Sequence, residues 1–211
     1  MKIAASVFTI EGMRRAEELK ADMIEFRLDL AQEDTCEIKM AMEKATVPTI
    51  LTLRSVHEGG VFRGGGEAWF DRIEPFLGTT TYVDTEMRFK AFSDRIRASG
   101  ASIIASIHMD RVLHMDELKS LESALRSYGD LPKIVVAVST HEDLLELLAF
   151  TLRAEKPVCT GTCGQAFAYS RFLLPLFGSE IVYCHAGTPT AEGQYHLKEF
   201  RSLYSAIFKS Q

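Results

Sequence analysis

Short, β-rich apolar segments alternate with amphipathic helical patterns along the whole 211-residue chain. The predicted strands span residues 2–8, 23–29, 48–55, 82–87, 101–108, 132–139, 157–161 and 181–185. The predicted helices span residues 10–21, 36–44, 67–77, 89–98, 116–128, 141–153, 170–176 and 193–209. Strands that alternate with helices form right-handed βαβ units and a parallel sheet. Eight such units predict one (β/α)8 (TIM) barrel domain, α/β in class, over residues 1–211.

An open, doubly wound sheet is the competing arrangement. Such a sheet usually carries a glycine-rich phosphate-binding turn after its first strand. Residues 8–12, Phe-Thr-Ile-Glu-Gly, lack that turn. The loop at 56–66 is rich in glycine but does not end in the Gly-Lys-Ser/Thr of a phosphate loop. We therefore favour the barrel and interpret this segment as a flexible loop after the third strand.

The composition narrows the classes of function. The chain is 46% hydrophobic and 25% charged, with a net charge of −5, which is ordinary for one globular domain. This balance gives no reason to expect nucleic acid or a membrane surface as partner. The first residues show no signal-peptide pattern, and no apolar run approaches the roughly 20 residues that cross a bilayer. The four cysteines form no CxxC pair, so we expect reduced thiols, a cytoplasmic location and no metal site.

Residues 23–29 alternate between apolar and charged side chains, which is typical of a strand with two different faces. A surface strand with solvated charges would show the same alternation. Later strands, however, also carry polar residues near their carboxyl ends, where the active site of a barrel lies. The polar residues at these ends are Glu25, Arg27, Asp29, Arg54, Asp84, Glu86, His108 and His185. Their repetition predicts an enclosed polar site, although charges at a barrel mouth are often only solvated or paired for structure.

His108, already among these residues, and Lys133 are the two that suggest catalytic chemistry. His108 ends an apolar run, where an imidazole has access to both the core and the mouth of the barrel. Lys133 opens the sixth strand, and there it is either a solvated lysine or, if its face points inward, a buried amine. A desolvated amine close to other cations loses its proton readily and becomes a nucleophile toward carbonyl groups. The spacing of the residues does not decide between these two interpretations.

A series of short motifs, in order through nearly the whole chain, resembles the type I 3-dehydroquinate dehydratases. The motifs are Glu25-Phe26-Arg27-Leu28-Asp29, Thr52-Leu53-Arg54-Ser55 with Glu58-Gly59-Gly60, Val83-Asp84-Thr85-Glu86, Ser106-Ile107-His108, Pro132-Lys133-Ile134, Ser170-Arg171 and Pro189-Thr190-Ala191-Glu192-Gly193-Gln194. The resemblance implies a (β/α)8 hydro-lyase of the shikimate pathway, which serves aromatic amino acid biosynthesis. Such an enzyme dehydrates 3-dehydroquinate to 3-dehydroshikimate through a lysine Schiff base, with no metal and no cofactor. The resemblance also implies a homodimer.

The resemblance assigns roles residue by residue. It implies that Lys133 is the Schiff-base nucleophile and that His108 is the proton donor and acceptor. The implied substrate-binding residues are Glu25, Arg27, Arg54, Arg171, Thr190 and Gln194, with Glu58, Asp84 and Glu86 in support. We expect Asp84 or Glu86 to orient the imidazole. The chain departs from the family pattern at Cys163, where methionine is usual, and at Phe167, where a second glycine is usual.

Two alternatives remain open at this stage. A class I aldolase is another barrel with a Schiff-base lysine on its sixth strand, but no clear phosphate-binding nest follows strands seven and eight. A non-catalytic barrel that binds a carboxylate metabolite is the second alternative, and the presence of both Lys133 and His108 argues against it. Finally, the loop at 186–192 is rich in small residues, and we expect it to close over the substrate.

Overall fold

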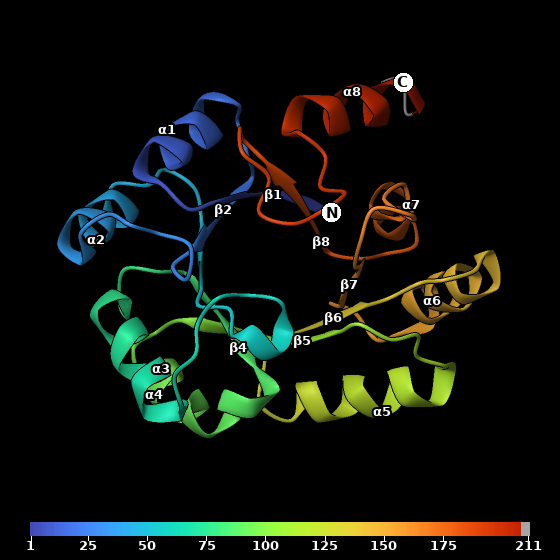
Figure 1. Ribbon diagram of the computed structural model, residues 1–211, viewed down its shortest axis with the longest axis horizontal. Helices are drawn as coiled ribbons and strands as arrows, with labels where there is room; N and C mark the ends of the chain where they lie inside the picture. Colours follow the sequence, from blue (N-terminus) through green and yellow to red (C-terminus); the bar gives the residue numbers. More distant parts are fainter. Residues whose placement is uncertain (208–211) are drawn as a thin grey trace.

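The computed structural model describes residues 1–207, which form eight parallel strands surrounded by helices (Figure 1). The strands are β1 (Lys2–Val7), β2 (Met23–Arg27), β3 (Thr49–Thr52), β4 (Tyr82–Glu86), β5 (Ser102–Met109), β6 (Leu131–Val136), β7 (Cys159–Thr162) and β8 (Ile181–His185). The α-helices are α1 (Ile10–Glu18), α2 (Thr35–Glu43), α3 (Gly66–Ile73), α4 (Ser93–Ala98), α5 (Met115–Arg126), α6 (His141–Arg153), α7 (Ser170–Leu176) and α8 (Leu197–Ile207). Three 3-10 helices, η1 (Val56–Glu58), η2 (Glu74–Phe76) and η3 (Met87–Phe92), complete the described elements.

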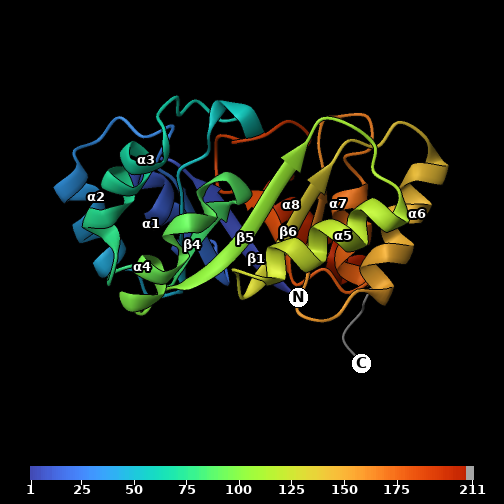
Figure 2. The same ribbon diagram turned by 90° about the horizontal axis from the view of Figure 1, so that it is seen from below.

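The strands follow the order β7-β6-β5-β4-β3-β2-β1-β8, so the last strand pairs with the first. This order confirms the predicted TIM barrel and excludes the doubly wound sheet. The barrel is nearly closed. At the junction of β7 and β8, the backbone N–H of Glu180 donates to the carbonyl of Val158 at 2.8 Å, and that of Thr160 donates to Ser179 Oγ at 2.9 Å. Figure 2 shows the strands inclined, with their carboxyl ends at the face opposite the N-terminus.

Most predicted elements are confirmed, with differences at their ends. The predicted helix at 89–98 is wrong in its first half, where the chain forms η3 before α4 begins. The predicted helix at 67–77 ends as α3 at Ile73, because Pro75 in η2 has no N–H to continue the helical hydrogen bonds. The last helix begins at Leu197 rather than at residue 193. Its predicted end at Lys209 lies outside the described residues.

The loop after β3 packs closely against the end of that strand. The backbone N–H of Phe62 donates to the carbonyl of Arg54 at 3.1 Å, and that of Gly60 donates to the carbonyl of Ser55 at 2.8 Å. A Cβ atom on Gly60 would lie 2.2 Å from the Arg54 carbonyl oxygen, so only glycine fits there. This close return of the chain places Glu58, in η1, over the mouth of the barrel.

On five strands the barrel interior changes from apolar to polar within two residues. Its base is a cluster of Ala4, Met23, Ile50, Ile104, Leu131, Cys159 and Ile181, one residue from each of seven strands. Side chains on one face of a strand recur every second residue. The next inward residues on five of these strands are Ser6, Glu25, Thr52, Ser106 and Lys133, and all five are buried. The interior thus consists of an apolar base beneath a polar layer.

The outer faces of the strands pack against the helices in a second, larger apolar core. Trp69 of α3 is fully buried there, stacks on Phe89 with ring centroids 4.6 Å apart, and donates from Nε1 to the carbonyl of Leu53 at 3.1 Å. No helix within residues 1–207 is long and apolar enough to span a bilayer.

The packing of α6 provides a test of the barrel with two matched leucines. Leu147 is 2% exposed and Leu145 is 65% exposed on the same helix. We expect Leu147→Ala to lower the free energy of unfolding by about 2–5 kcal/mol, because it leaves a cavity in the core. Leu145→Ala should change it by no more than about 0.5 kcal/mol. Urea unfolding followed by circular dichroism measures both, and equal effects would contradict this packing.

Candidate active site

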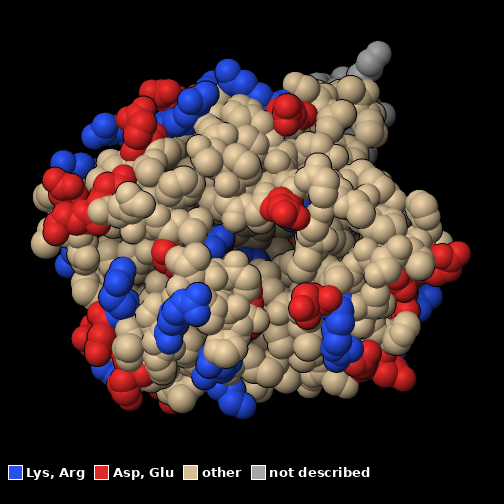
Figure 3. All heavy atoms as spheres, viewed as in Figure 1, with Lys and Arg blue, Asp and Glu red and all other residues tan. Residues whose placement is uncertain are grey.

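A cavity of about 320 Å³ opens at the carboxyl ends of the strands. Figure 3 shows this face hollowed near its centre. The predicted site residues that line the cavity are Glu25, Arg27, Arg54, Glu58, His108, Lys133, Arg171, Thr190 and Gln194. Asp84 and Glu86 do not line it but lie buried behind it, in contact with Arg54. Asp29 and His185, which we expected at the strand ends, also lie outside the lining.

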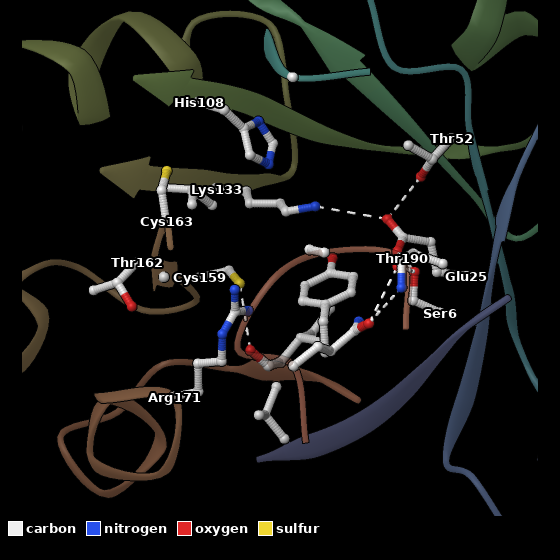
Figure 4. Close-up of a pocket in the computed structure, with 18 of the residues that line it drawn as sticks. Ser6, Glu25, Thr52, His108, Lys133, Cys159, Thr162, Cys163, Arg171 and Thr190 are labelled. Atoms are coloured by element: carbon white, nitrogen blue, oxygen red, sulfur yellow. Dashed lines mark hydrogen bonds and ion pairs between the residues drawn. The ribbon is translucent and has the colours of Figure 1, made fainter. Parts of the chain in front are cut away.

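Lys133 points into the barrel from β6 and is 4% exposed (Figure 4). Its Nζ atom donates to Asp84 Oδ2 at 2.9 Å and lies 3.7 Å from Glu25 Oε1. The same atom lies over the ring of Tyr183, 4.1 Å from the ring centroid. The interpretation of Lys133 as a solvated lysine is therefore wrong. Its amine stands in the polar layer, between two carboxylates and an aromatic face.

Arg54 joins the carboxylates of the polar layer. It donates to Asp84 at 2.8 Å, to Glu86 at 3.2 Å and to Glu58 at 3.1 Å. Burial alone would lower the pKa of Arg54, but Asp84, Glu58 and Glu86 raise it, so the guanidinium stays charged. Burial would likewise raise the pKa of Asp84, but Arg54 and Lys133 hold it well below its usual range. Asp84 is thus an ionised partner for both cations.

Glu58 holds the imidazole of His108. Its Oε2 atom lies 2.9 Å from His108 Nδ1 and accepts from the His108 backbone N–H at 3.0 Å. Arg54 donates to the same oxygen, so this oxygen acts as an acceptor and the Nδ1 atom carries the hydrogen. His108 Nε2 is then left unprotonated. The expectation that Asp84 or Glu86 orients the imidazole is wrong, because the imidazole donates its hydrogen bond to Glu58.

The buried surroundings set the protonation of this pair. Burial, followed by the charges of Arg54 and Lys133, holds the pKa of His108 well below its ordinary value. Burial also raises the pKa of Glu58 to about 8, against the opposing charge of Arg54. The imidazole is therefore neutral near pH 7, which is the form that accepts a proton.

The other end of the cavity presents donors from α7 and the loop after β8. Arg171 donates from Nη2 to the carbonyl of Glu192 at 3.0 Å, and its Nε is buried with no hydrogen-bond partner among the described residues. Thr190 donates from its backbone to Gln194 Oε1 at 2.9 Å and from Oγ1 to Ser6 Oγ at 2.8 Å. These bonds hold residues 190–194 against the cavity.

Arg27 lines the cavity with a fixed orientation. Its Nε and Nη2 atoms donate to the two carboxylate oxygens of Asp29, at 2.9 and 2.8 Å. Asp29 therefore serves to position Arg27. His185 instead packs edge-on against His196, with ring centroids 5.1 Å apart.

Of the two departures from the family pattern, only Cys163 reaches the cavity. Phe167 does not line it and packs edge-on against His141, with ring centroids 5.5 Å apart. Sequence reasoning missed other lining residues, above all Ser6, Thr52 and Tyr183. Their signal is position, since each follows an apolar base residue of its strand by two places. Among residues 1–207, no three His, Cys, Asp or Glu side chains group so as to hold a metal ion.

Comparisons with known proteins agree with this geometry. The family model of type I 3-dehydroquinase matches residues 8–211. A 3-dehydroquinate dehydratase of Methanoregula boonei is 45% identical over 98% of this chain and 100% of its own length. A 3-dehydroquinate dehydratase of Methanospirillum hungatei is 36% identical over 96% of this chain and 80% of its own length. The crystal structure of the Aquifex aeolicus enzyme superposes with a TM-score of 0.85 at 25% identity, covering 99% of this chain and all of that one.

The two histidines with opposite surroundings provide a test of the electrostatics. The pKa of exposed His114 is raised by its hydrogen bond to Glu146, whereas that of His108 is lowered by burial and nearby cations. We expect the His108 ring to stay neutral at pH 6.5, where an ordinary histidine is half protonated. His114 should titrate above that pH. NMR of the ring protons, assigned with His108→Gln and His114→Gln, measures both. A midpoint for His108 at or above that of His114 would contradict the burial account.

Proposed function

The chain belongs to the type I 3-dehydroquinase family, and we propose that it dehydrates 3-dehydroquinate to 3-dehydroshikimate through an imine formed on Lys133. This is the hydro-lyase step of the shikimate pathway, which leads to aromatic amino acids. The observation that supports the proposal is the buried Lys133 amine in the same cavity as the neutral imidazole of His108. The substrate is a cyclic β-hydroxy ketone with a carboxylate, and each of these groups has a counterpart in the cavity.

Imine formation is the first role. The amine of Lys133 adds to the ketone carbon, and loss of water leaves a protonated imine that draws electrons from the adjacent carbon. The protonated imine carries the same positive charge, at the same nitrogen, as the ammonium that it replaces. Asp84, at 2.9 Å from Nζ, and Glu25, at 3.7 Å, therefore stabilise the intermediate without rearrangement.

Proton transfer is the second role. The free Nε2 atom of His108 removes the proton next to the imine, and the resulting enamine expels the hydroxyl group. The imidazolium then protonates that leaving group, so one histidine performs both transfers. Addition of one water finally hydrolyses the product imine, which restores the ketone and frees the Lys133 amine. Glu58 Oε2 accepts from Nδ1 and so keeps the ring in the required tautomer. Such acid–base help accelerates a reaction by roughly 10²–10⁴-fold.

Substrate binding is the third role. The unpartnered Nε of Arg171 suits the substrate carboxylate, because a guanidinium makes charge-assisted hydrogen bonds in a fixed plane. Gln194 and Thr190 border the same region, and Glu25, Arg27 and Arg54 face the ring hydroxyls. The loop at 186–192 closes over the bound substrate and excludes water in this proposal. The homodimer, the cytoplasmic location and the lack of a cofactor remain predictions.

The aldolase and the non-catalytic barrel predict different behaviour. An aldolase would act on open-chain sugars, and a binding protein would turn over nothing. Membership of the dehydratase family argues against both.

Turnover tests the function. With 3-dehydroquinate, the protein should produce the absorbance of the conjugated enone product. Lys133→Ala should abolish turnover, and His108→Ala should lower it by at least about 10²-fold, because the proton transfers lose their carrier. Lys119→Ala, at an exposed lysine of α5, is the matched control and should keep full activity. Full turnover by Lys133→Ala, or none by the unaltered protein, would refute the proposal.

The carboxylate role of Arg171 has its own test. Arg171→Ala should raise KM by roughly 10- to 100-fold, since losing a charge-assisted partner costs about 1.5–3 kcal/mol. Arg171→Lys should recover little of this loss, because the planar fork is absent. Steady-state kinetics measure both, with exposed Arg153→Ala on α6 as the control. If lysine restores the affinity, the assignment is wrong.

A further inference from the structure

Tyr183 occupies a singular position in the polar layer. It lies on β8, two residues after Ile181 of the apolar base, and it lines the cavity. Lys133 Nζ lies over its ring, 4.1 Å from the centroid. Its hydroxyl group is buried and has no hydrogen-bond partner among the described residues. The ring of Tyr183 therefore contacts the amine, while its hydroxyl group makes no hydrogen bond to the described residues.

The other hydroxyl groups of this layer all donate hydrogen bonds to carboxylates. Ser6 and Thr52 donate to the two oxygens of Glu25, and Ser106 donates to Asp84. A buried hydroxyl without a partner is unfavourable, and phenylalanine would fill the same space without that cost. The partner of the Tyr183 hydroxyl must therefore come from what the cavity holds. This observation distinguishes Tyr183 from a residue that only fills space.

The reaction requires a donor at this place. When an amine adds to a ketone, negative charge develops on the carbonyl oxygen, and hydrogen-bond donors stabilise it. Asp84 beside Nζ is ionised and can only accept. Among the side chains of residues 1–207, the buried, unpartnered donors that line the cavity are Arg171 Nε and the Tyr183 hydroxyl, and of these two only Tyr183 contacts Lys133. Burial raises the pKa of Tyr183 well above 10, so the hydroxyl keeps its proton.

Building on the proposed imine at Lys133, we propose that Tyr183 is a further catalytic residue, whose hydroxyl donates a hydrogen bond to the substrate ketone oxygen as Lys133 adds to the carbonyl carbon. In this step Nζ gives up one proton before it adds, the Nζ–C bond forms, and the π electrons move to oxygen. The oxygen then takes up a second proton, which Nζ loses once bonded to carbon, to give the carbinolamine. The proton that Nζ gave up first joins the same oxygen, the C–O bond breaks, and water leaves behind the protonated imine. Tyr183 keeps its own proton throughout. The oxygen is only two bonds from Nζ, which places it beside the ring that Nζ overlies.

Tyr183→Phe removes the hydroxyl and retains the ring. Rapid mixing with saturating 3-dehydroquinate, followed by borohydride quenching, measures how fast the imine forms. We expect the rate to fall roughly 10- to 100-fold, which is the usual effect of losing one such donor. The thermal unfolding midpoint should stay equal or rise, because an unpaired buried hydroxyl is removed. Tyr82→Phe is the matched control, since Tyr82 packs against the same apolar base from β4; its rate should not change.

Several results would overturn this inference. An imine-forming rate within about twofold of the unaltered protein would do so. Weaker substrate binding with an unchanged rate of imine formation at saturation would also overturn it. So would a slower rate that is accompanied by a matching fall in thermal stability. Exchange of the ketone oxygen with labelled water must also slow in Tyr183→Phe, because both directions pass through the same carbinolamine. If the unaltered protein itself traps no adduct, the proposed imine fails instead, so the two failures are distinguishable.

Discussion

The buried ion cluster around Arg54 is the interaction on which the site depends. Arg54 contacts three carboxylates, and one of them, Asp84, also accepts from Lys133. Removing one partner of a buried ion pair typically costs about 3–5 kcal/mol, because the remaining charge is left uncompensated. The members of the cluster therefore fix one another. Through Asp84 the cluster positions the Lys133 amine, and through Glu58 it positions the His108 imidazole. The same ion cluster therefore fixes both groups relative to each other.

The barrel explains why such a cluster can exist in the interior. All the strands are parallel, so residues that lie two places after the apolar base on different strands reach the same height in the barrel. The base excludes water from below, so the charged groups of the polar layer pair with one another. The loop after β3 supplies the remaining group, because its close return at Gly60 carries Glu58 above Arg54. Fold and electrostatics thus combine to keep His108 neutral and Lys133 enclosed.

Much of this arrangement could be predicted from the sequence. The features that could not be predicted depend on strand register and on loop paths, which the sequence pattern does not show. The period-two pattern and the alternation of strands with helices predict the barrel, and α6, α7 and β8 have the predicted bounds. The orientation of Lys133 could not be derived from spacing, because the register between strands decides which face points inward. Glu58 was not identified as the partner of His108, since its place depends on the path of an irregular loop. Tyr183 resembles any aromatic residue in a buried strand, and only the unpaired hydroxyl sets it apart.

In the proposed function, the buried cluster presents Lys133 as the group that forms a covalent bond with substrate. Borohydride reduction in the presence of 3-dehydroquinate, followed by peptide mass spectrometry, tests this role of Lys133. We expect a stable secondary amine on the peptide that contains Pro132-Lys133-Ile134, formed only when substrate is present and absent in Lys133→Ala. An adduct on another lysine, or inactivation by borohydride without substrate, would contradict it.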